Sequence, residues 1–413
     1  MHLFHYADNE LFCEKKSVQR IARKIETPFY LYSKNSLLEN FNQTDAAFGD
    51  LEHSVCYALK ANSNETLLSL LAEQGAGADA VSGGEIYLAL KNGFKPEKIV
   101  YAGVGKTDAE IKYALEENIY SFHVESVQEL QVINEIAQSM DIVARVGIRV
   151  NPNIDIHGHP YISTGRSQDK FGIELQEVEQ IFSKIDHFQN IRLIGLHFHN
   201  GSQITEITPY RKTIEIAKGL QSLLRKSSIK LQYIDIGGGV GVSYENIFQN
   251  TDHVLSAELI ESIRNDLASL QCKILFEPGR SLIAEAGCLV TKVLFNKDTS
   301  GKKFLIVDAS MTDLIRPSLY QAYHEIVPLK KTRRSEASYD VVGPVCESGD
   351  FFARDRQLAQ MKRGEYLAIM TGGAYGFSLS SNYNARVRPA EILVDGEEYF
   401  VIRDRGKVEN LWG

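Results

Sequence analysis

The chain has 413 residues and a formal net charge of −8, with 44% apolar and 24% charged residues. This length and balance are typical of a folded protein of about two or three domains, which excludes a disordered tail protein and a collagen-like fibre. The acidic excess argues against a nucleic-acid partner, and no apolar run approaches the ~18 residues that a membrane helix needs.

The first 25 residues contain early acidic residues and no apolar signal segment, so we expect no secretory leader and a cytoplasmic protein. They fit no βα unit, and we assign them to the second domain described below. The 5 cysteines are scattered and form no CxxC pair. This spacing indicates neither a disulfide framework nor a zinc ribbon.

A run of 8 short β-branched or aromatic segments follows, with helical spacing of apolar residues between them. Strands that alternate with helices predict βα units and a parallel sheet. Eight such units in about 250 residues match a TIM-type (β/α)8 barrel of the α/β class, with an open doubly wound sheet as the alternative. The expected strands are 54–59, 78–81, 98–102, 119–123, 143–149, 192–198, 231–236 and 273–276.

Reactive side chains collect at the carboxyl ends of most of these strands. Barrel enzymes build their active sites on that face, whereas an open sheet concentrates its site at one switch point. We therefore favour the barrel and assign residues 26–282 to it. In chain order the residues are Lys60, Asp79, Arg149, His199, Ser202, Gly237, Gly238, Gly239, Glu277, Pro278, Gly279 and Arg280.

After about residue 282 the pattern changes to short strand-like runs separated by turn residues. This predicts a mostly antiparallel β domain of residues 283–413, completed by residues 1–25. Its expected strands are 289–295, 304–307, 339–342, 366–370, 391–394 and 398–402.

Several of these residue types suggest chemistry in their own right. In a barrel mouth Lys60 would be partly desolvated, which frees its amine for a Schiff base, although a capping surface lysine is the simpler alternative. The three glycines 237–239 let backbone amides converge on an anion, and Ser202 could add a hydroxyl group. A tight turn explains the same glycines, and a plain salt bridge explains Glu277 with Arg280.

The histidine pairs 157/159 and 197/199 suggest a metal site as a second possibility, if each pair faces inward. No carboxylate cluster with ligand spacing accompanies them, so we expect no metal. Cys346 lies in a turn-rich segment beside Glu347 and Asp350. These acids disfavour a thiolate, which makes a proton-donating thiol more suitable than a nucleophile; a buried structural cysteine is the alternative.

Taken together and in order, the motifs resemble the diaminopimelate decarboxylases, pyridoxal-phosphate enzymes with an alanine-racemase-like fold. The resemblance covers nearly the whole chain. The motifs are YALKAN at 57–62, HGHPYISTG at 157–165, KFG at 170–172, HFHNGSQ at 197–203, GGG at 237–239, EPGR at 277–280, RPSLY at 316–320, CESGD at 346–350 and GAYG at 373–376.

The resemblance implies a role for each cofactor-binding residue. Lys60 would hold pyridoxal phosphate, with Asp79 nearby, and His199 would stack on its ring. Glu277 would pair with the pyridine nitrogen and keep it protonated. The phosphate would lie on Gly237, Gly238, Gly239 and Ser202, with Pro278, Gly279, Arg280 and Tyr375 also lining the cofactor.

The resemblance also implies a substrate and an assembly. We expect decarboxylation of meso-2,6-diaminopimelate to L-lysine and CO₂, the last step of lysine biosynthesis, with Cys346 reprotonating Cα. Arg280 and Arg316 would hold the distal carboxylate, since a guanidinium matches it in bidentate fashion. Tyr320 and Tyr375 would assist, and Glu347 would take the distal ammonium. In this family Cys346 and Glu347 come from the partner subunit, which implies a homodimer.

Alternatives from other classes stay open at this point. One is a different member of the fold that decarboxylates another basic amino acid or racemises one, although Glu277 argues against a racemase. Another is a metal-dependent barrel hydrolase that uses the histidine pairs. A third is a non-catalytic cofactor carrier, which would need neither the β domain nor Cys346.

Overall fold

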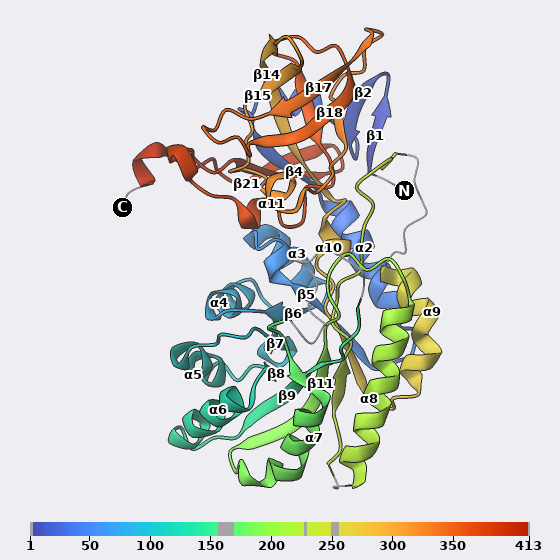
Figure 1. Ribbon diagram of the computed structural model, residues 1–413, viewed down its shortest axis with the longest axis vertical. Coiled ribbons are helices and arrows are strands. Elements are labelled where there is room, and N and C mark those ends of the chain that lie inside the picture. Colours follow the sequence, from blue (N-terminus) through green and yellow to red (C-terminus); the bar gives the residue numbers. More distant parts are fainter. Residues whose placement is uncertain (1–2, 156–168, 227–228, 249–255, 412–413) are drawn as a thin grey trace. The chain divides into compact units, whose positions relative to one another are not determined.

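The computed structural model describes residues 3–155, 169–226, 229–248 and 256–411 (Figure 1). The chain forms two compact units. The barrel unit consists of Asn40–Gly241 and Val254–Ser281, and the β unit consists of Met1–Glu39, Val242–His253 and Leu282–Gly413. None of the described helices is both long and apolar enough to cross a membrane.

The barrel unit contains a closed ring of parallel strands, which confirms the (β/α)8 expectation. Each expected strand is present, and the ring closes because the first strand pairs with the last and the fourth with the fifth. In ring order the strands are β5 (His53–Ala58), β6 (Gly77–Ala80), β7 (Ile99–Tyr101), β8 (Ser121–Val124), β9 (Ala144–Asn151), β11 (Ile191–Phe198), β12 (Tyr233–Asp235) and β13 (Lys273–Phe276). The two-residue strand β10 (Ile173–Glu174) pairs with β9 outside this ring.

Helices follow the strands and lie outside the ring (Figure 1). The helices are α2 (Lys34–Ala46), α3 (Glu65–Glu73), α4 (Gly83–Lys91), α5 (Asp108–Glu116), α6 (Val127–Ser139), α7 (Leu175–Lys184), α8 (Thr208–Lys226), α9 (Ser256–Ala268) and α10 (Arg280–Ile283). Side-chain caps fix the starts of several of them: Thr107 and Glu110 form a reciprocal capping box at the start of α5, and the Ser126 hydroxyl caps α6.

One large aromatic side chain, that of Tyr233, extends into the barrel interior. The ring of Tyr233, on β12, lies against Gly147 and Gly195, and a Cβ atom on either glycine would collide with it. The Tyr233 hydroxyl donates a hydrogen bond to Ser121 Oγ (2.8 Å) and lies 3.1 Å from His123 Nε2. Two glycines on neighbouring strands therefore make room for a tyrosine that links β12 to β8 across the ring.

The β unit is built around a mostly antiparallel sheet in the order β18-β17-β15-β14-β4-β20-β21. The pairs β15–β17 and β4–β20 are its parallel exceptions. Its strands are β4 (Phe29–Ser33), β14 (Gly287–Asp298), β15 (Lys303–Val307), β17 (Glu336–Val342), β18 (Phe351–Ala359), β20 (Ala390–Asp395) and β21 (Glu398–Arg403). The strands β16 (Ile326–Pro328) and β19 (Tyr366–Ile369) extend it from β14.

The N-terminal strands form a small antiparallel sheet of β1 (Phe4–Ala7), β2 (Glu10–Cys13) and β3 (Lys16–Ser17), followed by α1 (Val18–Ala22). Their apolar side chains join one core with those of β4, β14 and β20. The expected boundary at residue 26 differs from the structure, because β4 pairs with β14 and β20. All five residues of β4 are buried, so its sequence lacks the alternation that would indicate which sheet it joins.

Candidate active site

The amine of Lys60 lies at the carboxyl end of the barrel strands. Lys60 follows β5 in the short turn Leu59–Ala61, and its ammonium forms an ion pair with Asp79 on β6. Burial and the charge of Glu277 raise the pKa of Asp79, while Lys60 opposes the rise. The second oxygen of Asp79, Oδ1, has no hydrogen-bond partner among the described residues. A fully buried acid thus fixes a lysine whose side chain is 33% exposed.

The glycine loop that follows β12 packs directly on neighbouring backbone. Gly237 and Gly239 have φ of +69° and +94°, which side-chain-bearing residues rarely adopt. A Cβ on Gly238 would collide with the carbonyl oxygen of Glu277. The Gly237 amide donates to Asp235 Oδ1 (2.8 Å) and the Gly238 amide to a histidine, so two of the three amides expected to face an anion already serve side chains. Gly239 is the loop's remaining amide donor.

His199 accepts the hydrogen bond from the Gly238 amide at its Nδ1 atom (3.2 Å). Burial, followed by the positive charges of Arg149 and Lys60, lowers the pKa of His199 to about 3. The imidazole is therefore neutral at neutral pH, with Nδ1 as the acceptor and the proton on Nε2. A neutral ring at this position can stack on a flat ligand without adding a charge.

The segment 277–280 packs against the turn that carries Lys60. The Ala58 amide donates to the carbonyl oxygen of Pro278 (3.2 Å), and a Cβ on Gly279 would lie 3.0 Å from Ala58 Cβ. The Arg280 guanidinium donates to Ser202 Oγ (2.9 Å). The plain Glu277–Arg280 salt bridge considered from the sequence is replaced by these separate contacts, because Glu277 faces two histidines.

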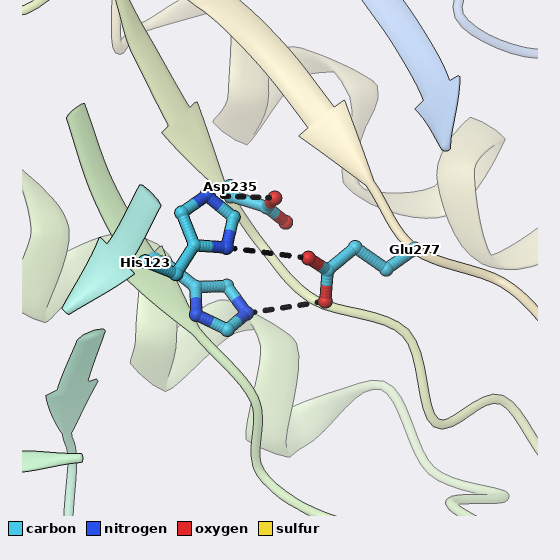
Figure 2. Close-up of side chains that lie close together, drawn as sticks. His123, Asp235 and Glu277 are labelled. Atoms are coloured by element: carbon cyan, nitrogen blue, oxygen red, sulfur yellow. Dashed lines mark hydrogen bonds and ion pairs between the residues drawn. The ribbon is translucent and has the colours of Figure 1, made fainter. Parts of the chain in front are cut away.

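Four buried side chains, here called the buried quartet, meet inside the barrel: His123, His197, Asp235 and Glu277. Figure 2 labels three of them, His123, Asp235 and Glu277. Glu277 Oε2 lies 3.1 Å from His197 Nε2, and Glu277 Oε1 lies 3.5 Å from His123 Nδ1. The two imidazole rings stack with centroids 4.1 Å apart. His123 Nε2 also lies 3.8 Å from Asp235 Oδ2. The quartet therefore joins strands β8, β11 and β12 to the residue that follows β13.

Burial and mutual contacts shift the pKa values of three members of the buried quartet. Burial lowers the pKa of His197 to about 3, so its ring is neutral. Burial and the charge of Glu277 raise the pKa of Asp235 well above its usual range, which favours its protonated form. Burial opposes ionisation of Glu277, but His197 and His123 hold its pKa well below the usual value. Glu277 is thus an ionised acid whose Oε1 atom has no hydrogen-bond partner among the described residues.

The quartet also bears on the metal alternative. Its ligand atoms lie within 4.8 Å of one another, close enough for one ion. The pairing expected from the sequence is nevertheless different, since His197 stacks on His123 while His199 contacts the glycine loop. The second pair, His157 and His159, lies outside the described residues.

The remaining candidate residues belong to the β unit. Arg316 begins α11 (Arg316–Tyr320) and is buried, with its NH1 atom 2.8 Å from His324 Nε2. Tyr320, at the end of that helix, is partly exposed. Tyr375 is also partly exposed and has φ of +55°, a left-handed backbone that few residues other than glycine adopt.

Cys346 is a free, exposed cysteine, so the alternative of a buried structural cysteine is wrong. Its amide donates to Asn384 Oδ1 (2.9 Å), and Glu347 Oε1 accepts from the Gly349 amide (3.3 Å). Asp350 holds the loop from inside: its carboxylate accepts the amide hydrogens of Val345 and Met311. The thiol is thus presented to solvent by a loop whose shape is fixed by backbone hydrogen bonds.

Sequence reasoning missed His123 and Asp235 in the barrel unit, and His324 beside Arg316 in the β unit. The first two lie within strands and belong to no motif. A polar residue in an otherwise apolar strand, as in the SFHV of β8, is the one signal that could have indicated an inward-facing group.

Comparison with known proteins identifies the family. Residues 34–284 match the model of the pyridoxal-binding domain of pyridoxal-dependent decarboxylases. A diaminopimelate decarboxylase of Aquifex aeolicus is 46% identical over 400 residues, which cover 97% of this chain and 94% of that protein. One of Pseudomonas aeruginosa is 42% identical over 412 residues, covering 100% and 98%. The chain belongs to the diaminopimelate decarboxylase family.

Solved structures of the family have the same fold. Diaminopimelate decarboxylase from Helicobacter pylori, complexed with L-lysine, superposes with a TM-score of 0.90 at 43% identity, covering 95% of this chain and 98% of that one. The enzyme from M. jannaschii, also with L-lysine, gives 0.93 at 35% identity, covering 99% and 96%. These matches confirm the family, the barrel-plus-β fold and the pyridoxal phosphate dependence expected from the sequence.

Proposed function

We propose that this protein is a pyridoxal-phosphate-dependent decarboxylase that converts meso-2,6-diaminopimelate into L-lysine and CO₂. The observation that carries the proposal is the match, along nearly the whole chain, to relatives named diaminopimelate decarboxylase. This reaction completes lysine biosynthesis, which suits the cytoplasmic location expected from the sequence.

The barrel site suits pyridoxal phosphate in three respects. Glu277 is a buried anion with an orphaned oxygen, and a protonated pyridine nitrogen is the cationic donor that would satisfy it. The glycine loop lacks side chains where a phosphate would approach, and Lys60 offers an amine. Bound there, pyridoxal phosphate supplies the electron sink that stabilises the carbanion left when CO₂ departs.

Each barrel residue then has a defined task. Lys60 would hold the cofactor through its amine, and Asp79 orients the lysine through their ion pair. His199, a neutral imidazole, would stack on the cofactor ring. The Gly239 amide and Ser202 would hold the phosphate, and the hydrogen bond from Arg280 fixes the position of the Ser202 hydroxyl.

Substrate selection depends on the distal end of the molecule. Ornithine and lysine present a lone distal cation, whereas diaminopimelate presents a carboxylate beside its distal ammonium. Arg316 and Arg280 bind that carboxylate, because a guanidinium fork matches it in bidentate fashion. Tyr320 and Tyr375 line the same end, and Glu347 accepts the ammonium.

Cys346 protonates Cα after CO₂ leaves. Its thiol is free and exposed on the β unit, so it is accessible as a proton donor. We assign Cys346 and Glu347 to the active site of the partner subunit, so that the enzyme works as a homodimer with shared active sites.

The first experiment measures L-lysine formation from meso-diaminopimelate, with and without added pyridoxal phosphate. We expect cofactor-dependent lysine production by the wild type and none by Lys60→Ala. A bound cofactor without lysine production would keep the fold and move the substrate to another amino acid. Metal analysis of the active protein tests the hydrolase alternative, which requires a stoichiometric ion.

A further inference from the structure

Arg316 lies in a socket of side chains that no sequence motif indicated. Its NH1 atom lies 2.8 Å from Nε2 of His324, and its guanidinium lies over the ring face of Tyr244, 4.4 Å from the centroid. The rings of Tyr244 and His324 meet edge to face, with centroids 5.0 Å apart. Arg316 is 6% exposed and His324 is fully buried. The guanidinium is therefore contacted both on its face and at one of its nitrogens.

The hydrogen bonds of His324 fix its tautomer. Its Nδ1 atom lies 2.7 Å from the carbonyl oxygen of Met370, which can only accept, so Nδ1 carries a proton. An arginine N–H can only donate, so Nε2 offers a lone pair to Arg316. His324 is thus a neutral acceptor that orients Arg316 without a negative charge to neutralise it.

Tyr244 is held in place by backbone contacts on both sides. The Glu325 amide donates to the carbonyl oxygen of Tyr244 (3.2 Å), and the Glu325 carboxylate accepts from the Asn246 amide (2.7 Å). The Met370 amide in turn donates to the carbonyl oxygen of Glu325 (2.8 Å). The segment that carries Tyr244 is therefore tied to the segments that carry and contact His324.

We propose that His324 and Tyr244 are positioning residues for substrate specificity: they hold the Arg316 guanidinium in one orientation, fully charged, for the distal carboxylate of the substrate. The inference rests on the proposed function and deepens it. A free arginine side chain loses much rotamer entropy when it is fixed in one orientation. Because His324 and Tyr244 restrict these rotamers before the substrate binds, less conformational entropy is lost on binding. A carboxylate in place of His324 would instead neutralise the charge that recognises the substrate.

The test compares two ligands that differ in one group. L-Lysine keeps the distal carboxylate of diaminopimelate, and cadaverine (1,5-diaminopentane) lacks it. Dissociation constants for both are measured by calorimetry on the full-length protein loaded with pyridoxal phosphate. For each variant, KM and kcat with meso-diaminopimelate are measured alongside.

We expect His324→Leu to weaken L-lysine binding about tenfold, as it would if the competent Arg316 orientation fell to about a tenth of the population. Cadaverine binding and cofactor content should stay unchanged, and KM should rise more than kcat falls. His324→Gln can still accept from Arg316 and donate to Met370, so it should bind L-lysine within about twofold of the wild type. Tyr244→Phe keeps the ring face and should match the wild type, whereas Tyr244→Leu should lose affinity for L-lysine alone.

The variant Arg316→Lys distinguishes a failure of the proposed function from a failure of the positioning roles. If the wild type forms no lysine and does not prefer L-lysine to cadaverine, the proposed function fails and this inference with it. If the wild type does both, and Arg316→Lys loses the preference while His324→Leu and Tyr244→Leu keep it, only the positioning roles are overturned. Should His324→Leu fail to fold, the Tyr244 pair decides alone.

Discussion

The protonation of the buried quartet can be tested by replacing Asp235 with its neutral isostere. Asp235 Oδ1 accepts the Gly237 amide hydrogen at 2.8 Å, and its pKa is raised by burial and by the charge of Glu277. If Asp235 is protonated, Asp235→Asn keeps both the acceptor for Gly237 and a donor on the other atom. The free energy of unfolding should then change by less than about 0.5 kcal/mol, as at other sites without a lost contact.

Asp235→Ala provides the contrasting case. It leaves the Gly237 amide buried without an acceptor, which costs about 1–3 kcal/mol, and it also opens a small cavity. The free energy of unfolding of both variants is measured by urea unfolding at pH 7. Their affinity for pyridoxal phosphate is measured from the cofactor absorbance. We expect the Asn variant to retain wild-type affinity and the Ala variant to lose it. If the Asn variant were as damaged as the Ala variant, Asp235 would be ionised, and burial and Glu277 would not raise its pKa as described.

Three further predictions concern the proton donor, the glycine loop and acid stability. Cys346→Ala should bind the cofactor normally but lower kcat by about 10²–10⁴, the usual contribution of a general acid; full turnover would remove its assigned role. Gly238→Ala should weaken cofactor binding because its Cβ would collide with the Glu277 carbonyl oxygen, whereas Gly219→Ala, in open space on α8, should stabilise the fold by about 0.5–1 kcal/mol in thermal unfolding. His197 has a pKa of about 3 when folded. Since the unfolded imidazole takes up a proton below about pH 6.5, His197 lowers stability by roughly 2 kcal/mol at pH 5 relative to pH 8, and His197→Gln should remove that part of the acid sensitivity measured by urea unfolding. An unchanged pH dependence in this variant would contradict a neutral buried His197.

The barrel could be predicted from sequence because each strand is a short apolar run with a helix after it. The reactive residues at the strand ends, such as Lys60, Asp79 and Glu277, could be found for the same reason: parallel strands bring their carboxyl ends to one face. His123 and Asp235 could not be found. They lie on β8 and β12, which are not neighbours in the ring, and meet only across its interior.

The domain boundary and the surroundings of Arg316 could not be predicted from the local sequence pattern. A fully buried strand such as β4 has an apolar sequence that would suit either unit. Arg316 and His324 are separated by a helix and a left-handed turn at Gln321, so their contact depends on tertiary packing. The sequence indicated Arg316 as a candidate site residue, but it did not indicate that His324 contacts it.

The position of β4 also constrains the order in which the chain can fold. This early strand lies between β14 and β20, whose residues begin at Gly287 and Ala390. During synthesis the barrel segments leave the ribosome before either partner, so the barrel can close while β4 still lacks both neighbours. An apolar strand with two open edges is prone to pair with other chains. The edge of β4 that pairs with β20 therefore stays exposed until nearly the whole chain has been synthesised.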